Sequence, residues 1–165
     1  MLDDIDIRIL TILQGNARTA NAAIGRQIGL TPSAVFQRIR KLEESGVIRG
    51  YHAHVDPAAV DQGLLAFVAV GTGEGARAKE TAAMLSDIPE VTEVHRVVGE
   101  DCFFLKVRVK DTAALGRLLD EKVQRLPPVA STRTTIVLST AKDELPGPHR
   151  NGSAPASPQN GDSTA

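Results

Sequence analysis

The side chains best suited to chemistry lie on one segment, Pro32–Ser45, whose apolar residues recur at the spacing of a helix. Val35, Ile39 and Leu42 share one face of that helix, so the polar side chains must project from the other. These are Ser33, Gln37, Arg40 and Lys41, with Arg38 on the flank and Thr31 just before the helix. Glutamine suits a paired contact with adenine, arginine or lysine suits guanine, and Arg38 suits a phosphate as well as a base. This surface therefore indicates nucleic-acid binding.

Positive charge gathers around this helix, although the whole chain carries a net charge of −1. From Ala17 to His54 there are six basic and two acidic residues, which leaves a local charge of +4. On a lone helix such a run is usually a solvated face. Within a helix-turn-helix, however, the second helix is the one that enters the major groove, and a clustered positive charge is what a phosphate-facing surface requires.

Three predicted helices position this surface. The first covers about residues 3–14, and the second covers residues 19–28 and stops at Gly29. Thr31-Pro32 then supplies the cap and the first turn of the third helix. Two helices joined by a short glycine turn make a helix-turn-helix. The small Gly25 is expected to let the second and third helices pack closely.

The segments that flank the two predicted domains differ in pattern. Residues 46–55 alternate between apolar and polar side chains, which predicts a strand that serves as a wing or pairs with a second subunit. The sequence thus favours a DNA-binding domain at residues 1–55 and a linker at 56–63. Residues 143–165 are rich in proline, glycine and serine without apolar periodicity, which predicts a disordered tail.

Residues 64–142 predict a second domain that mixes strands and helices. Strands are expected at 64–70, 91–98, 102–109 and 129–139, with helices at 76–86 and 111–126. The order β-α-β-β-α-β is the ferredoxin-like arrangement, and the fold class is α+β. Both helices pack on one face of the sheet. The strands are apolar enough for the other face to be buried as well, which predicts face-to-face dimerisation.

A turn between the second and third strands of this domain carries the candidate effector site. The candidate contacts are Gly99, Glu100, Asp101 and Cys102, with Thr132 and Thr134 on the last strand. Glycine lets backbone N–H groups approach a carboxylate closely, while an acidic side chain suits an ammonium group. An α-amino acid carries both charges and is the expected ligand, bound where the turn meets a neighbouring subunit. The alternative is an ordinary polar turn between two strands.

Other reactive side chains favour structural roles. His52 and His54 share one face of the predicted strand, but no third metal ligand is apparent nearby, so no metal site is expected. The stretch Gly71–Gly75 lacks the Gly-Lys-Ser/Thr ending of a phosphate loop. Cys102 is expected to be small, buried and inert. No cofactor and no catalytic residue is assigned.

The composition also predicts a compartment. No stretch approaches the ~18 uninterrupted apolar residues of a membrane span, which excludes a membrane partner. The acidic N-terminus is unlike a secretory signal. A single cysteine permits no intrachain disulfide. We therefore expect a cytoplasmic protein.

Several stretches, in their order and spacing, resemble the Lrp/AsnC family of feast/famine regulators over Leu2 to about Lys142. They are Leu2-Asp-Asp-Ile-Asp-Ile-Arg-Ile-Leu10, Ile28-Gly-Leu-Thr-Pro-Ser33, Arg38–Tyr51, Val98-Gly-Glu-Asp101 and Thr132–Leu138. The resemblance implies a winged helix-turn-helix joined to an effector-binding domain, in a bacterial or archaeal transcription regulator that binds double-stranded DNA. Members of this family form dimers and often tetramers or octamers, and many respond to amino acids.

One turn departs from the family pattern. The family commonly has Gly-Asp-x-Asp-Tyr there, whereas this chain has Gly99-Glu-Asp-Cys-Phe103. A cysteine thus replaces the second aspartate, which favours a ligand that depends less on a second negative group, such as an apolar or aromatic amino acid.

Two other function classes stay open from the residues alone. An RNA-binding module has the same strand order, and Phe103-Phe104 lie on the third strand, where one of the two rings could stack on a base. A small α/β enzyme is the other class, although no Ser-His-Asp or Cys-His set is apparent.

Overall fold

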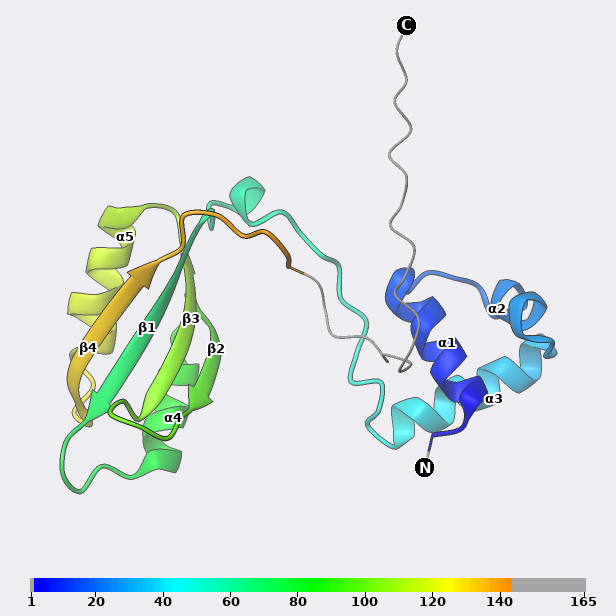
Figure 1. Cartoon of the computed structure of the whole chain (residues 1–165), viewed down its shortest axis with the longest axis horizontal. Coiled ribbons are helices and arrows are strands. Elements are labelled where there is room, and N and C mark those ends of the chain that lie inside the picture. Colours follow the sequence, from blue (N-terminus) through cyan, green and yellow to red (C-terminus); the bar gives the residue numbers. More distant parts are fainter. Residues whose placement is uncertain (1, 144–165) are drawn as a thin grey trace, which may run out of the picture. The chain divides into compact units, whose positions relative to one another are not determined.

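The computed structural model describes residues 2–143, which form two compact units (Figure 1). The first unit extends to Ala53 and the second spans His54–Lys142. Except for Asp143, the predicted tail at 143–165 lies outside the described residues. None of the described helices is long and apolar enough to cross a membrane.

The first unit is a bundle of three helices around one small core. Its helices are α1 (Asp4–Gly15), α2 (Asn21–Ile28) and α3 (Pro32–Glu44). The core consists of Ile9, Leu13, Ile24, Val35, Ile39 and Leu42. Side-chain caps fix where α1 and α3 begin: Asp3 and Asp6 form a reciprocal capping box, and the Thr31 hydroxyl accepts a hydrogen bond from the Ala34 N–H.

The turn between α2 and α3 is closed by two glycines that act differently. Gly29 has a φ of 78°, a left-handed conformation that a side chain would resist. Gly25 is buried, and a Cβ on it would lie 2.4 Å from the carbonyl oxygen of Leu30. The close approach that Gly25 permits is thus with the turn that leads into α3. Leu30 packs against the core, which anchors this turn.

The strand predicted at residues 46–55 is not present. This segment follows α3 as a turn and an irregular stretch, tied to α3 by the Ile48 N–H, which donates to the Leu42 carbonyl at 3.0 Å. The prediction was wrong for the single chain because a strand needs a neighbouring strand to pair its backbone groups, and the first unit contains no strand among its described residues.

The second unit is a four-stranded antiparallel sheet with the ferredoxin-like topology that was predicted. Its elements are β1 (Leu64–Thr72), α4 (Ala78–Ser86), β2 (Val91–Arg96), β3 (Phe103–Val109), α5 (Thr112–Arg117) and β4 (Val129–Ile136). The spatial order is β2-β3-β1-β4 (Figure 1). The helix predicted at 111–126 is divided, because α5 continues into a π-helical turn, Leu118–Val123. Before β1, residues Pro57–Val60 form a 3₁₀ turn.

The two faces of this sheet differ. Ala66, Val68 and Val70 of β1 pair with Val107, Leu105 and Phe103 of β3, and these side chains are buried with residues of α4 and α5. On the other face, Phe67 and Phe104 stack with ring centroids 5.7 Å apart, and Phe104 remains 39% exposed. Adjacent strand residues alternate between faces, so Phe103 is buried while Phe104 marks the uncovered face.

Candidate DNA-binding surface and ligand site

Burial of the apolar side of α3 turns a polar side outward. Thr31, Ser33, Gln37, Arg40 and Lys41 are all exposed, as the sequence predicted. Arg40 forms an ion pair with Glu44 at 2.8 Å. Within residues 2–143 the side chains of Gln37 and Lys41 have no hydrogen-bond or ion-pair partner. Their polar groups are available to another molecule.

Arg38 is placed differently from these residues. Its guanidinium lies 2.6 Å from Asp3 and 2.8 Å from Asp6, both at the start of α1. The two carboxylates raise the pKa of Arg38. The pKa of Asp3 is lowered, first by the backbone N–H of Asp6 and then by Arg38. Arg38 therefore joins the N-terminus of α1 to the flank of α3, an interaction that the helical pattern alone did not reveal.

The segment that follows α3 returns to it through Tyr51. The Tyr51 hydroxyl donates a hydrogen bond to Glu43 Oε1 at 2.9 Å. Partial burial, followed by this contact with a carboxylate, raises the pKa of Tyr51 to about 12. The neighbouring His52 and His54 are exposed, and no group of three histidine, cysteine or acidic side chains within residues 2–143 could hold a metal ion.

The turn predicted to bind an effector is held by contacts with β1 and β4. Gly99 has a φ of 148°, which disfavours a side chain at that position. Asp101 pairs with Arg133 of β4 at 2.5 Å. Glu100 is exposed. Sequence reasoning missed Arg133, although it lies between the two candidate threonines; a lone charge on a strand gave no indication of a partner so far away in the chain.

Cys102, which was expected to be buried, is partly buried. The Thr72 hydroxyl donates a hydrogen bond to its sulfur at 3.1 Å. This bond, together with one from the Thr72 backbone, lowers the pKa of the thiol. Cys102 packs against the core of the second unit as one of its partly buried residues.

Thr132 and Thr134 lie on the helix-covered side of β4, opposite Val70 and Val68. The Thr132 hydroxyl accepts a hydrogen bond from Gln124 at 3.0 Å. The threonines therefore lie on the opposite face from Arg133, because side chains alternate along a strand. Within one chain, the turn contacts β4 through the ion pair between Asp101 and Arg133.

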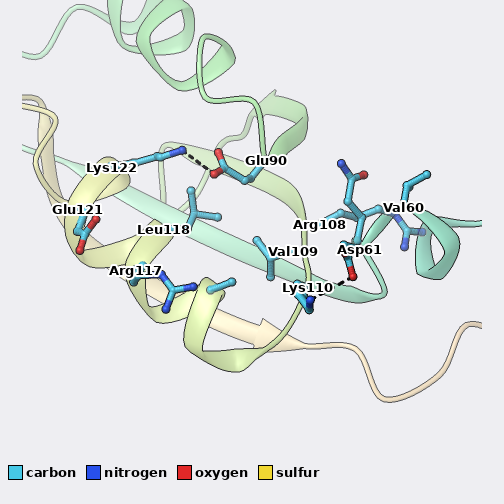
Figure 2. A pocket seen from close by; sticks show the side chains of 12 residues that line it. Val60, Asp61, Glu90, Arg108, Val109, Lys110, Arg117, Leu118, Glu121 and Lys122 are labelled. Atoms are coloured by element: carbon cyan, nitrogen blue, oxygen red, sulfur yellow. Dashed lines mark hydrogen bonds and ion pairs between the residues drawn. The ribbon is translucent and has the colours of Figure 1, made fainter.

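A cavity of about 360 Å³ lies at the far end of β3 from this turn. Figure 2 shows its two ion pairs, Lys122–Glu90 at 2.5 Å and Lys110–Asp61 at 3.3 Å. The Lys122 ammonium is the main reason that the pKa of Glu90 is lowered. None of the predicted effector residues lines this cavity. At ~3.3 Å per residue, the length of β3 separates the two places by about 20 Å.

Two family models match the chain, one for each unit. Residues 2–49 match a winged helix-turn-helix DNA-binding domain, and residues 65–146 match the Lrp/AsnC ligand-binding domain. These matches cover both candidate sites, the polar face of α3 and the turn at 99–102.

Among curated proteins, the HTH-type transcriptional regulator AldR of Mycolicibacterium smegmatis is 37% identical over 147 residues, covering 88% of this chain and 86% of AldR. The leucine-responsive regulatory protein of Salmonella typhimurium is 38% identical over 143 residues, covering 86% and 87%.

Solved structures of transcription regulators are also similar to this chain. A transcriptional regulator, NMB0573, from Neisseria meningitidis in complex with L-Met matches with a TM-score of 0.83 and 31% identity. AsnC of E. coli matches with a TM-score of 0.83 and 30% identity. Each alignment covers 88% of this chain and 97% of the other.

The contact between Tyr51 and α3 can be measured directly because Tyr51 is the single tyrosine of a chain without tryptophan. We expect its phenolate to form near pH 12, seen as tyrosinate absorbance in an alkaline titration. Glu43→Gln should lower this midpoint toward the ordinary value of 10.0, because a neutral amide does not repel the phenolate. Glu44→Gln is the control, since Glu44 pairs with Arg40 instead.

The raised pKa of Tyr51 also determines how the stability of the fold depends on pH. A raised pKa in the folded state stabilises the fold below about pH 10, and this contribution is lost as the pH rises toward 12. A wild-type midpoint near 10, unchanged by Glu43→Gln, would show that Tyr51 does not contact α3 in solution.

Proposed function

Because this chain belongs to the Lrp/AsnC family of transcription regulators, we propose that α3 enters the major groove of a target duplex as one half of a symmetric dimer. The observation that supports this is the exposed polar face of α3, where the side chains of Gln37 and Lys41 have no hydrogen-bond or ion-pair partner within residues 2–143. In a helix-turn-helix the second helix reads base edges, and half-sites lie about one helical turn apart or a multiple of it. A target on chromosomal DNA implies a cytoplasmic location.

The polar residues of α3 divide by what each can contribute. Gln37 offers the paired donor and acceptor that match adenine, and Arg40 the fork that matches guanine. Arg40 must first leave Glu44, which costs little because both side chains are 61% exposed and such pairs are worth ~0–1 kcal/mol. Lys41 and the helix start at Thr31 and Ser33 suit phosphates. Arg38 already binds two carboxylates, so its contribution to DNA binding is chiefly to hold α3 in place.

Substitutions on α3 should separate sequence recognition from general affinity. We expect Gln37→Ala to reduce the preference for the target over unrelated duplex, and Lys41→Gln to weaken binding to every duplex and lower the salt slope by about one. Arg38→Gln should weaken binding and also lower the melting temperature. Gel shifts on the DNA upstream of the gene, at several salt concentrations, measure these effects.

Lys79→Gln, an exposed lysine on α4, is the matched control and should bind like wild type. Single-stranded RNA serves as the competing ligand. Unchanged affinity and salt slope in both α3 variants, or equal binding of RNA, would rule out this role for α3.

For the effector, we propose an α-amino acid bound at the turn formed by residues 99–102, where a neighbouring subunit completes the site. The structurally similar regulator from N. meningitidis was solved with L-Met, and the S. typhimurium relative is named leucine-responsive. Glu100 is free to meet an ammonium group, and the backbone at Gly99 is open to a carboxylate, with nothing within 4 Å of its Cβ position. Cys102 in place of an acidic residue favours an apolar or aromatic side chain on the ligand. Thr132 and Thr134 lie on the opposite face of β4 from Arg133, so they would contribute hydroxyl groups to a ligand that reaches the helix-covered face.

Calorimetry with the twenty common amino acids, beginning with L-leucine, L-methionine and L-phenylalanine, tests this site. We expect Gly99→Val, which strains the turn and puts a side chain where the carboxylate would approach, and Asp101→Ala, which releases the turn from Arg133, to weaken binding. The expected loss is about tenfold or more, comparable to that of one charge-assisted hydrogen bond. Arg117→Gln, in the cavity at the other end of β3, should leave binding unchanged. If Arg117→Gln abolishes binding and Gly99→Val does not, the cavity is the effector site; if no amino acid binds at millimolar concentration, the proposal fails.

For assembly, we propose that the uncovered face of the sheet is buried by a second copy of this chain. The stacked pair Phe67 and Phe104 lies at its centre, beside Leu65 and Ala69 of β1. Charged side chains such as Lys106 and Glu93, 3.0 Å apart, flank this apolar centre. An apolar centre with a polar rim is the anatomy of a protein–protein interface.

A matched pair of substitutions tests this interface. Phe104 and Met84 are both 39% exposed, but Met84 lies on α4, in the helical layer. We expect Phe104→Lys to weaken the dimer at least tenfold, because it places an unpaired charge at the apolar centre of both subunits, and burial of such a charge is costly. Met84→Lys should leave it intact. Light scattering on the full chain measures the mass; a Phe104→Lys variant with wild-type mass at micromolar concentration would place the interface elsewhere.

A further inference from the structure

Phe36 is an exposed aromatic side chain on the helix proposed to read DNA. It lies in α3 and is 51% exposed. It belongs neither to the buried core of the first unit nor to the partly buried residues packed against it. About half of the phenylalanine surface therefore stays in contact with water, so this half contributes no burial to the fold and is open to a partner molecule.

The position of Phe36 on the helix connects it with the polar residues. Ser33, Phe36, Gln37 and Arg40 follow the spacing i, i+3, i+4 and i+7, which puts them on one stripe of a helix. Homeodomains read base pairs through four residues of their recognition helix at this same spacing. In this chain the second position of the stripe is held by an aromatic ring.

A phenyl ring has no hydrogen-bonding group, so it cannot read the donors and acceptors of the base edges. The apolar group that the major groove presents is the C5-methyl of thymine, and phenylalanine is one of the side chains that contact it. An A·T pair offers this methyl beside the adenine edge, which suits the amide of Gln37, the next residue. The two side chains together match an A·T-containing step.

We propose that Phe36 is a specificity-determining residue that packs against the methyl group of a thymine in each half-site. This inference rests on the proposed entry of α3 into the major groove. It adds a contact that discriminates by shape and apolar burial to the polar contacts of Gln37 and Arg40.

Deoxyuridine provides the test, because it pairs like thymine but lacks the methyl group. The full-length protein is titrated against its target duplex, with each thymine replaced by deoxyuridine in turn. For wild type, we expect one position in each half-site where the replacement weakens binding about fourfold, the value of one buried methyl-sized group. Phe36→Ala should bind the thymine and deoxyuridine duplexes equally well.

Two further variants keep the result specific to Phe36. Phe36→Leu keeps an apolar side chain and should retain part of the discrimination. Val47→Ala removes another exposed apolar side chain of the first unit, 41% exposed, and should discriminate like wild type. Circular dichroism establishes that each variant is folded.

The outcomes separate this inference from the proposed function. If Gln37→Ala and Lys41→Gln alter DNA binding but no thymine position responds to deoxyuridine, α3 reads DNA and the inference about Phe36 is wrong. The inference is also wrong if Phe36→Ala still distinguishes thymine from deoxyuridine, whether or not this variant keeps the dimer in light scattering. If wild type shows no sequence-dependent binding at all, the proposed function fails, and the inference with it.

Discussion

The packing of α3 against α1 and α2 is the constraint on which the DNA-binding surface depends. Val35, Ile39 and Leu42 have exposed fractions between 0% and 9%, so they fix the rotation of α3 about its own axis. With 3.6 residues per turn, this rotation decides which side chains face away from the core. Gly25 contributes by admitting the Leu30 carbonyl to a place where a side chain would collide, which lets the chain enter α3 directly from a core-anchored turn.

Ion pairs hold this unit together without using all of its positive charge. Arg38 is committed to Asp3 and Asp6, and it thereby links the first turn of α1 to the flank of α3. Arg40 and Glu44, both exposed, form a pair that binding can exchange at little cost. The side chain of Lys41 has no hydrogen-bond or ion-pair partner within residues 2–143. The basic residues of one short helix thus divide into a structural group and a group available to phosphates and bases.

In the second unit, the alternation of side chains along a strand decides which residues are buried and which lie on the uncovered face. Phe103 closes the core beneath α4 and α5, while Phe104, the next residue, is stacked on Phe67 on the uncovered face. The turn at residues 99–102 and the cavity that Glu90 helps to line lie at opposite ends of β3. The turn proposed to bind an effector and this cavity are therefore separate places on one small sheet.

The sequence by itself determined the local structure and the family. Helix caps such as Thr31-Pro32, the left-handed Gly29 and the apolar periodicity of α3 act within a few residues, so their consequences could be predicted. The β-α-β-β-α-β order followed from the same kind of pattern. Only the tertiary structure decided what Arg38 and Asp101 do, because their partners lie 35 and 32 residues away in the chain. It likewise decided that residues 46–55 form no strand and that Phe36 stays outside the core, because pairing and burial depend on which neighbours the fold brings near, and no local pattern specifies those neighbours.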